Sequence, residues 1–407
     1  MDGRATRRRF LSALGAAGVG GGLAPATGQA TTDNSVDATT ASVPFYGSHQ
    51  AGIATPSQQC VHFLALDVVS ANAGDLRSLL RTLSGAAAAI AHGRPVGALA
   101  TGFEPPVDTG EAIGHPTART TVTLGLGPAI FASGRFGLAA KRPAPLVYLP
   151  SFPGDALVPG WTGGDVGLQV CSDDPQVAFH AVHDLIRLAA PTAVPRWSLA
   201  GFGNTANSRR QSTPRNLMGF KDGTNNIKVE DSSTLDQFVW AGAPESPTWM
   251  RGGSYMVLRR IAMLFGHWDE ISLSVQEQAF GRHKVSGAPL GGVHEHDRVN
   301  LGAQVHGQPR IPADAHIRLA SPSYNAGQQL LRRGYNFTDG IDHDGAAVSG
   351  GLLFICYQRD PRKQFIPIQT ELAADALSQH IEPRGSAVFA CPPGARRGGF
   401  VGERLFS

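Results

Sequence analysis

The chain has 407 residues, of which 42% are hydrophobic and only 16% are charged, so it is long enough for two globular domains and too apolar to be disordered. The formal net charge of +3 comes from residues 1–30, which carry four arginines and one acid. Because the remaining basic and acidic residues are equal in number and no basic block follows, the composition excludes a nucleic-acid-binding protein.

Residues 1–30 have the features of an export signal. The segment 6–12, TRRRFLS, precedes a weakly apolar run too short to span a membrane, and Gly28-Gln29-Ala30 offers small residues for cleavage. Paired arginines before Phe-Leu resemble the twin-arginine signal, whose export machinery carries folded proteins. The sequence therefore predicts a cofactor-loaded protein in the periplasm or outside the cell, with residues 31–57 as a flexible polar linker.

Hydrophobic periodicity predicts a β-α-β-β-α-β order for residues 58–215. Strands are indicated by CVHFLALDVV from Cys60, TTVTLGLG from Thr120 and DVGLQVCSDD from Asp165. Helical spacing of leucines indicates a helix over 76–93, and Pro175 is placed to begin an amphipathic helix over 175–190. This order is typical of a ferredoxin-like domain.

A similar order is predicted for residues 216–407. Three strands are expected, at 254–264, 350–360 and 386–394, and two helices, at 267–284 and 366–381. We therefore predict an α+β protein of two ferredoxin-like domains, each an antiparallel sheet with packed helices, with the boundary near residue 215.

The spacing of the cysteines and histidines bears on metal binding and on haem attachment. None of the four cysteines has the C-x-x-C spacing of a zinc site or the C-x-x-C-H spacing of covalent haem, so structural thiols are expected at Cys60, Cys171, Cys356 and Cys391. His294 and His296 have H-x-H spacing, but they follow two glycines and are expected to be solvent histidines of a loop.

The most informative segment is 216–226, NLMGFKDGTNN, in which Asp222 lies in a glycine-flanked turn. An Asp-Gly turn alone is a common loop signal. However, G-x-x-D-G resembles the distal-loop motif of dye-decolourising peroxidases, specifically their deferrochelatase/peroxidase-like branch. Five further segments resemble the same family in the same order, and together the resemblance covers about residues 58–400: IFASGRFGL (130–138), LPSFPGD (149–155), DDPQVAFHAV (173–182), QEQAFGRHKVSGAPLG (276–291) and LLRRGYNF (330–337).

The resemblance implies a haem site in the C-terminal domain. Peroxide cleavage needs an iron with a donating axial ligand, a base for the peroxide proton and a cation over the O–O bond. By the family match, His316 is the iron ligand, Asp222 the distal acid–base group and Arg332 the distal cation. The adjacent Arg333 is the alternative cation, and Arg332 is preferred because the distal arginine of the family is the first of the pair. The cofactor implied is one non-covalent haem b per chain. Its further contacts are expected at Arg332 and in the loop segments that contain Gly223, Thr224, Asn225 and Ser321.

Two consequences concern carboxylates. A carboxylate base stays ionised in acid where an imidazole would be protonated, so activity is expected to favour acidic solution. In the predicted helix over 366–381, Asp375 falls on an otherwise buried stripe. Two interpretations remain open: Asp375 is a buried hydrogen-bond partner of His316, or it is a surface acid on a misjudged helix.

The resemblance implies a peroxidase that uses H₂O₂ to oxidise bulky phenolic or dye-like electron donors by one-electron steps. Large donors would not reach the iron, so a surface Tyr or Trp relay is expected, with four candidates: Tyr335, Tyr357, Trp240 and Trp249. One alternative is an exported, deferrochelatase-like protein that binds haem and releases its iron. Another is a non-catalytic metal binder that uses the H-x-H loop. The sequence is compatible with an oligomer and leaves the physiological reductant open.

Overall fold

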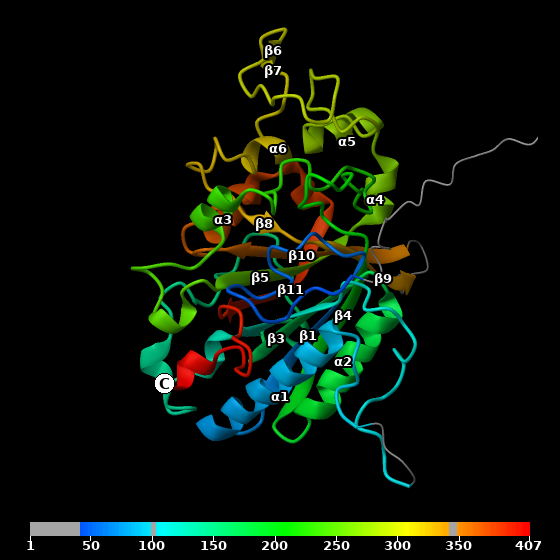
Figure 1. Cartoon of the computed structure of the whole chain (residues 1–407). Helices are drawn as coiled ribbons and strands as arrows, with labels where there is room; N and C mark the ends of the chain where they lie inside the picture. Colours follow the sequence, from blue (N-terminus) through cyan, green and yellow to red (C-terminus); the bar gives the residue numbers. More distant parts are fainter. Residues whose placement is uncertain (1–40, 99–102, 342–347) are drawn as a thin grey trace, which may run out of the picture. The chain divides into compact units, whose positions relative to one another are not determined.

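The computed structural model describes residues 41–98, 103–341 and 348–407 (Figure 1). The predicted export signal at 1–30 lies outside the described residues. No helix in the described ranges is long and apolar enough to cross a membrane.

The N-terminal half is an antiparallel sheet with two helices on one face. Its elements are β1 (Cys60–Val68), α1 (Ala73–Ala91), β2 (Thr121–Leu126), β3 (Val166–Ser172), α2 (Pro175–Ala189) and β4 (Ala193–Phe202). The strand order is β4-β1-β3-β2, and α1 and α2 lie side by side beneath the sheet in Figure 1. The Asp174 side chain caps α2 by accepting hydrogen bonds from two backbone amides, and Pro175 begins the helix as predicted.

The C-terminal half repeats this order with more interruptions. Its main elements are β5 (Ser254–Met263), α4 (Phe265–Glu270), α5 (Leu273–Phe280), β9 (Tyr335–Ile341), β10 (Val348–Gln358), α7 (Phe365–Glu371) and β11 (Ile381–Cys391). The strand order is β11-β5-β10-β9, which is the order of the first half. The prediction of two ferredoxin-like halves is therefore confirmed.

Shorter elements connect these halves and their strands. The short helices and strands are α3 (Ser232–Phe238), β6 (Gln304–Val305), β7 (Gln308–Pro309), α6 (His316–Leu319) and β8 (Leu331–Arg332). Single 3-10 turns are η2 (Pro128–Phe131), η3 (Ala139–Lys141), η4 (Pro159–Trp161), η5 (Thr248–Met250), η6 (Leu372–Ala374), η7 (Ala376–Gln379) and η8 (Glu403–Phe406).

The two half-sheets join into one closed ring of strands. Strand β4 pairs with β9 through Phe202 and Asn336, and β11 pairs with β2 through Ala390 and Leu126. Strand β5 also pairs with β10 within the C-terminal half. This pairing completes the ring, which therefore has no open edge. The interior of the ring holds an apolar cluster that includes Phe63, Met256 and Phe389. Both halves contribute to this one core. The domain boundary expected near residue 215 therefore stays a prediction.

Both long helices predicted for the C-terminal half are wrong in extent. The helix expected over 267–284 is divided into α4 and α5, because the Ser272 hydroxyl caps α5 and Gly281 ends it with a left-handed backbone at φ 76°. The helix expected over 366–381 ends at Glu371 and continues as η6 and η7, with Asp375 at the junction. Side-chain caps at these breaks compete with helix continuation.

Part of the predicted flexible linker is instead packed. Within 41–57, Phe45 and Ile53 are buried, and the Gln50 side-chain amide donates hydrogen bonds to the carbonyls of Leu124 and Pro392. Those two carbonyls belong to opposite halves of the molecule. The segment therefore ties the halves together, and only its low hydrophobic periodicity made it look like a linker.

The four cysteines are free, and three of them are buried, as expected for structural thiols. Burial raises the pKa of Cys356 and of Cys391 well above the ordinary thiol value. Such thiols are poor nucleophiles at neutral pH.

We expect Asp155→Asn to lower the free energy of unfolding by about 3–5 kcal/mol, because it leaves the Arg259 guanidinium buried without its counter-charge. The side chains of Asp155 and Arg259 form an ion pair and are 3% and 1% exposed. The matched control is Asp67→Asn, which breaks the half-exposed Arg196–Asp67 pair and should cost about 0–1 kcal/mol. Equilibrium urea unfolding of both variants tests this, and equal losses would contradict it.

Candidate active site

Asp222 lies at the end of a loop closed by backbone hydrogen bonds. Its amide donates to the carbonyl of Pro214 at 2.9 Å, and Arg215 bridges to Lys221 in antiparallel fashion. The following Gly223 has φ 117°, and a Cβ there would lie 2.6 Å from the backbone nitrogen of Ala206. Glycine is required at this close approach, and the backbone that carries the Asp222 carboxylate is thereby fixed.

Arg332 ends β8 and reaches Asp222 across the site. Its Nη1 donates to Asp222 Oδ1 at 2.6 Å, and the two side chains are 29% and 14% exposed. Asn226 fixes the backbone of Arg332 from both sides: the amide of Arg332 donates to Asn226 Oδ1 at 2.9 Å, and Asn226 Nδ2 donates to the carbonyl of Arg332 at 2.8 Å. No role for Asn226 is predicted from the sequence, because an asparagine in a turn-rich segment is an ordinary loop residue.

His316 begins α6 and is held by a carboxylate. Its Nδ1 lies 2.5 Å from Asp375 Oδ2, while Asp375 Oδ1 accepts a hydrogen bond from the amide of Leu377. Burial alone would lower the pKa of His316, but the Asp375 carboxylate raises it above its ordinary value. Of the two interpretations left open for Asp375, the buried partner of His316 is the one that the contact supports. The predicted helical stripe that suggested this partner is wrong, because Asp375 lies between η6 and η7 and not in a continuous helix.

The His316 side chain is partly buried and partly exposed. Its side chain is 39% exposed, the Phe280 ring meets it edge-on at 6.2 Å between centroids, and Nε2 has no hydrogen-bond partner among the described residues. The charges of Arg332 and Asp222 both act on its pKa, so the ion pair and the imidazole share one region.

Two further cations border this region. Lys228 donates to the carbonyl of Gly223 at 3.2 Å, and Arg282 donates to the carbonyls of Gly287 and Glu295. Burial, and then the charge of Arg332, lower the pKa of Lys228, while burial is the main cause that lowers the pKa of Arg282. Neither side chain forms an ion pair within the described ranges. The positive charge of Arg332 repels those of Lys228 and Arg282, so an anionic ligand would be favoured here.

These groups fit a haem. A carboxylate-held imidazole with a free Nε2 is the donor that haem iron takes, and the surplus of positive charge suits the two haem carboxylates. For the loop residues predicted to contact haem, the structure shows hydrogen bonds to other protein groups or exposure to solvent. The Thr224 hydroxyl donates to Glu295 at 3.0 Å, Asn225 is exposed, and the Ser321 hydroxyl donates to the carbonyl of Arg318 at 2.8 Å. Their contacts with haem, and that of Gly223, stay predictions.

The H-x-H loop contributes through its acid rather than its histidines. His294 and His296 have side chains 83% and 70% exposed, as expected for loop histidines. Glu295 between them forms an ion pair with Lys221 and accepts a hydrogen bond from Thr224. Burial would raise the pKa of Glu295, but hydrogen bonds from Lys221 and two threonines lower it. Through Glu295, the loop therefore holds the residues on both sides of Asp222 in place.

The predicted surface relay is not supported at the four named aromatic residues. All are buried, with exposed fractions from 0% to 9%: Tyr335, Tyr357, Trp240 and Trp249. The Tyr335 hydroxyl donates to the Cys171 thiol inside the ring of strands. A relay that meets a bulky donor at the surface needs an exposed ring, so these four do not serve as its outer end.

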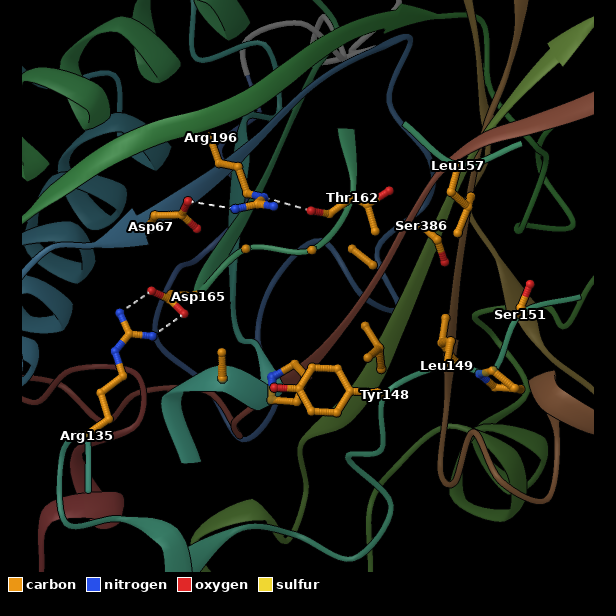
Figure 2. A pocket seen from close by; sticks show the side chains of 17 residues that line it. Asp67, Arg135, Tyr148, Leu149, Ser151, Leu157, Thr162, Asp165, Arg196 and Ser386 are labelled. Carbon is orange, nitrogen blue, oxygen red and sulfur yellow. Dashed lines mark hydrogen bonds and ion pairs between the residues drawn. The ribbon is translucent and has the colours of Figure 1, made fainter. Parts of the chain in front are cut away.

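A cavity of about 720 Å³ lies apart from the predicted site residues (Figure 2). Its charged side chains are already paired, Arg135 with Asp165 and Arg196 with Asp67, as the dashed lines in Figure 2 show. Because none of the predicted site residues lines it, this cavity carries none of the chemistry described above.

The comparisons with known proteins agree along almost the whole chain. The family model described as Dyp-type peroxidase, N-terminal, matches residues 50–203, and the model described as Dyp-type peroxidase, C-terminal, matches residues 213–396. The chain is 36% identical over 401 residues to the protein named Deferrochelatase of Escherichia coli K12, covering 96% of this chain and 94% of that protein.

Solved structures give the same result. The structure titled ferric DtpA from Streptomyces lividans is 38% identical, with a TM-score of 0.83, and the match covers 91% of this chain and 98% of that one. A DyP-type peroxidase from Cellulomonas bogoriensis is 40% identical, with a TM-score of 0.81 and coverage of 91% and 99%.

Proposed function

Because the chain belongs to the Dyp-type peroxidase family and is a haem peroxidase, we propose that His316, Asp222 and Arg332 form its active centre. The observation that carries this proposal is the meeting of two pairs in one region, the Asp375–His316 pair and the Arg332–Asp222 pair. They supply the ligand, the base and the cation that peroxide cleavage requires.

Each side chain has a distinct task. His316 Nε2 would bind the haem iron, and Asp375, at Nδ1, would fix the ring orientation and make the imidazole a stronger electron donor. Asp222 accepts a hydrogen bond from Arg332 at Oδ1, and Oδ2, which has no described partner, is free to take a proton from peroxide. Arg332 orients peroxide and stabilises negative charge on the departing oxygen. When bound, haem supplies the redox-active iron on which these groups act.

A spectrum and a turnover assay test this function. The purified protein should show a Soret band and should oxidise a bulky phenol or dye only when H₂O₂ is present. The predicted alternative, release of iron from haem, would instead yield iron-free porphyrin, which fluorescence detects. A haem-loaded protein that turns over no donor with H₂O₂ would contradict the proposed role of the site.

We also propose that residues 1–30 export the folded, haem-loaded protein through the twin-arginine pathway. Replacing Arg7 and Arg8 together with lysine should leave the haem-loaded protein in the cytoplasm, because the paired arginines are the recognised feature. Arg9→Lys, in the next position, is the matched control and should be exported normally. Cell fractionation with a Soret measurement tests this. Normal export of the double variant, or export of haem-free chain alone, would contradict it.

A further inference from the structure

A second group of ionisable side chains is buried in the N-terminal half, against α2. Asp108 lies in the segment 103–120, which packs on α2, and His180 and Asp184 lie one helical turn apart on α2. Their exposed fractions are 2%, 5% and 0%. None of the three belongs to the candidate active site.

Their donor atoms lie close together. His180 Nε2 lies 3.5 Å from Asp184 Oδ2 and 3.7 Å from Asp108 Oδ2, and one donor atom from each of the three residues lies within 4.8 Å of the others. These separations are too long for good hydrogen bonds. Donors bound to one Zn²⁺ lie about 2.0–2.2 Å from it and therefore roughly 3–3.5 Å from each other.

The His180 ring is already oriented for such a ligand role. Its Nδ1 lies 2.9 Å from Glu111 Oε2, which directs Nε2 toward the two aspartates. Glu111 is itself held by the Thr109 hydroxyl and by His183 Nδ1 at 2.7 Å. A carboxylate on the far nitrogen of a histidine is the usual outer partner of a metal-bound imidazole.

Among the described residues, His180 alone lies within ion-pair distance of the two aspartates, and it carries a charge only when it is protonated. Oδ1 of Asp184 accepts a hydrogen bond from the amide of Thr109 at 3.0 Å, whereas its Oδ2 is buried without a hydrogen-bond partner. Asp108 accepts hydrogen bonds from the amides of Val96 and Gly110. Within the described ranges, no lysine or arginine forms an ion pair with either aspartate. Two such carboxylates are costly to bury unless a cation joins them.

We propose that Asp108, His180 and Asp184 bind a divalent transition-metal ion of the Zn²⁺ or Mn²⁺ class. One imidazole and two carboxylates form a mixed donor set that suits these ions. The task is structural, because the ion would fasten the segment that carries Asp108 to the helix that carries the other two ligands. The alternative occupant is a proton, which would make His180 an imidazolium between two aspartates.

The first test needs no variant. The haem-loaded protein is washed with chelator and titrated with Zn²⁺ in a calorimeter, and bound zinc and haem are measured separately by metal analysis and the Soret band. We expect one Zn²⁺ per chain and a thermal unfolding midpoint that rises with Zn²⁺ concentration. Failure of the haem site would leave this zinc result unchanged, so the two proposals fail independently.

Variants locate the ion. Asp184→Asn keeps the side-chain shape and removes one charge, and it should weaken Zn²⁺ binding at least tenfold. Glu111→Gln, which changes only the outer partner, should weaken it by about 10–100-fold. The matched control replaces the exposed His294 and His296 with alanine, and it should bind Zn²⁺ like the parent.

Three results would overturn the proposal: no zinc uptake by the parent protein, full binding by the Asp184→Asn variant, or loss of binding in the His294/His296 control. If Asp184→Asn does not fold, the Glu111→Gln variant and the zinc-dependent midpoint of the parent still decide the question. A midpoint that responds to pH and never to Zn²⁺ would assign the cluster to the imidazolium alternative.

Discussion

Arg332→Leu is expected to slow the reaction of the haem-loaded protein with H₂O₂ by a factor of about 10² to 10⁴. The substitution removes the proposed distal cation, and it also leaves Asp222 without its ion-pair partner. Lys228 and Arg282 lie close enough to interact with Arg332, but both are tied to backbone carbonyls and neither contacts Asp222. They therefore do not replace the lost guanidinium.

Asp222→Asn is also expected to slow the reaction with H₂O₂, but by a smaller factor than Arg332→Leu, because water or a haem carboxylate can take over part of the proton transfer. Arg332→Lys is the matched control, since it keeps the charge while losing the planar fork of donors. Stopped-flow measurement of the Soret change after mixing with H₂O₂, from acid to neutral pH, gives the rates. If Arg332→Leu and Asp222→Asn both react as fast as the parent at every pH, neither residue is the distal catalyst.

His316→Ala is expected to abolish or strongly weaken haem retention, because it removes the nitrogen that we propose would bind the iron of a non-covalent haem. Asp375→Asn should retain haem with an affinity about 10–100-fold lower, since only the outer partner of the ligand changes. Haem content per chain, from the Soret band, and the rate of haem transfer to an acceptor protein measure both effects.

The matched control for His316 is His283→Ala. His283 also pairs through Nδ1 with a carboxylate, Glu277 at 2.8 Å, and its side chain is 41% exposed against 39% for His316. The control should keep full haem content. Acid–acetone extraction should remove the haem from the parent protein, and haem that stays on the chain would contradict non-covalent binding. Full haem content with unchanged spectra in His316→Ala would refute the assignment of His316.

The sequence predicted the N-terminal half better than the C-terminal half for physical reasons. The helix begun by Pro175 has a strong apolar stripe and a clear cap, so local signals suffice. In the second half, Ser272 and Asp375 cap short helices within stretches that have helical periodicity, and a cap competes with the helix without changing the pattern. Burial of segment 41–57 depends on partners far away in sequence, which periodicity does not detect.

In the candidate site, too, the sequence predicted what local motifs indicate and missed what depends on residues distant in the chain. The position of Asp222 between glycines and the family resemblance made it a candidate, and the structure adds that its carboxylate meets Arg332. The tasks of Asn226 and Glu295 became visible only through their hydrogen bonds to residues distant in the chain. The Asp108–His180–Asp184 cluster gave no sequence signal of its own, because its first member lies more than one element away from α2.

The closed ring of strands has a consequence for the order of events during synthesis. Strand β11, near the C-terminus, pairs both with β5 and with β2 of the opposite half, so the ring cannot close until almost the entire chain has left the ribosome. Pairings between strands so distant in sequence form slowly, because the loop entropy is lost before the contacts form. We expect ring closure to follow translation rather than to accompany it, because β11 must be complete before its pairings can form.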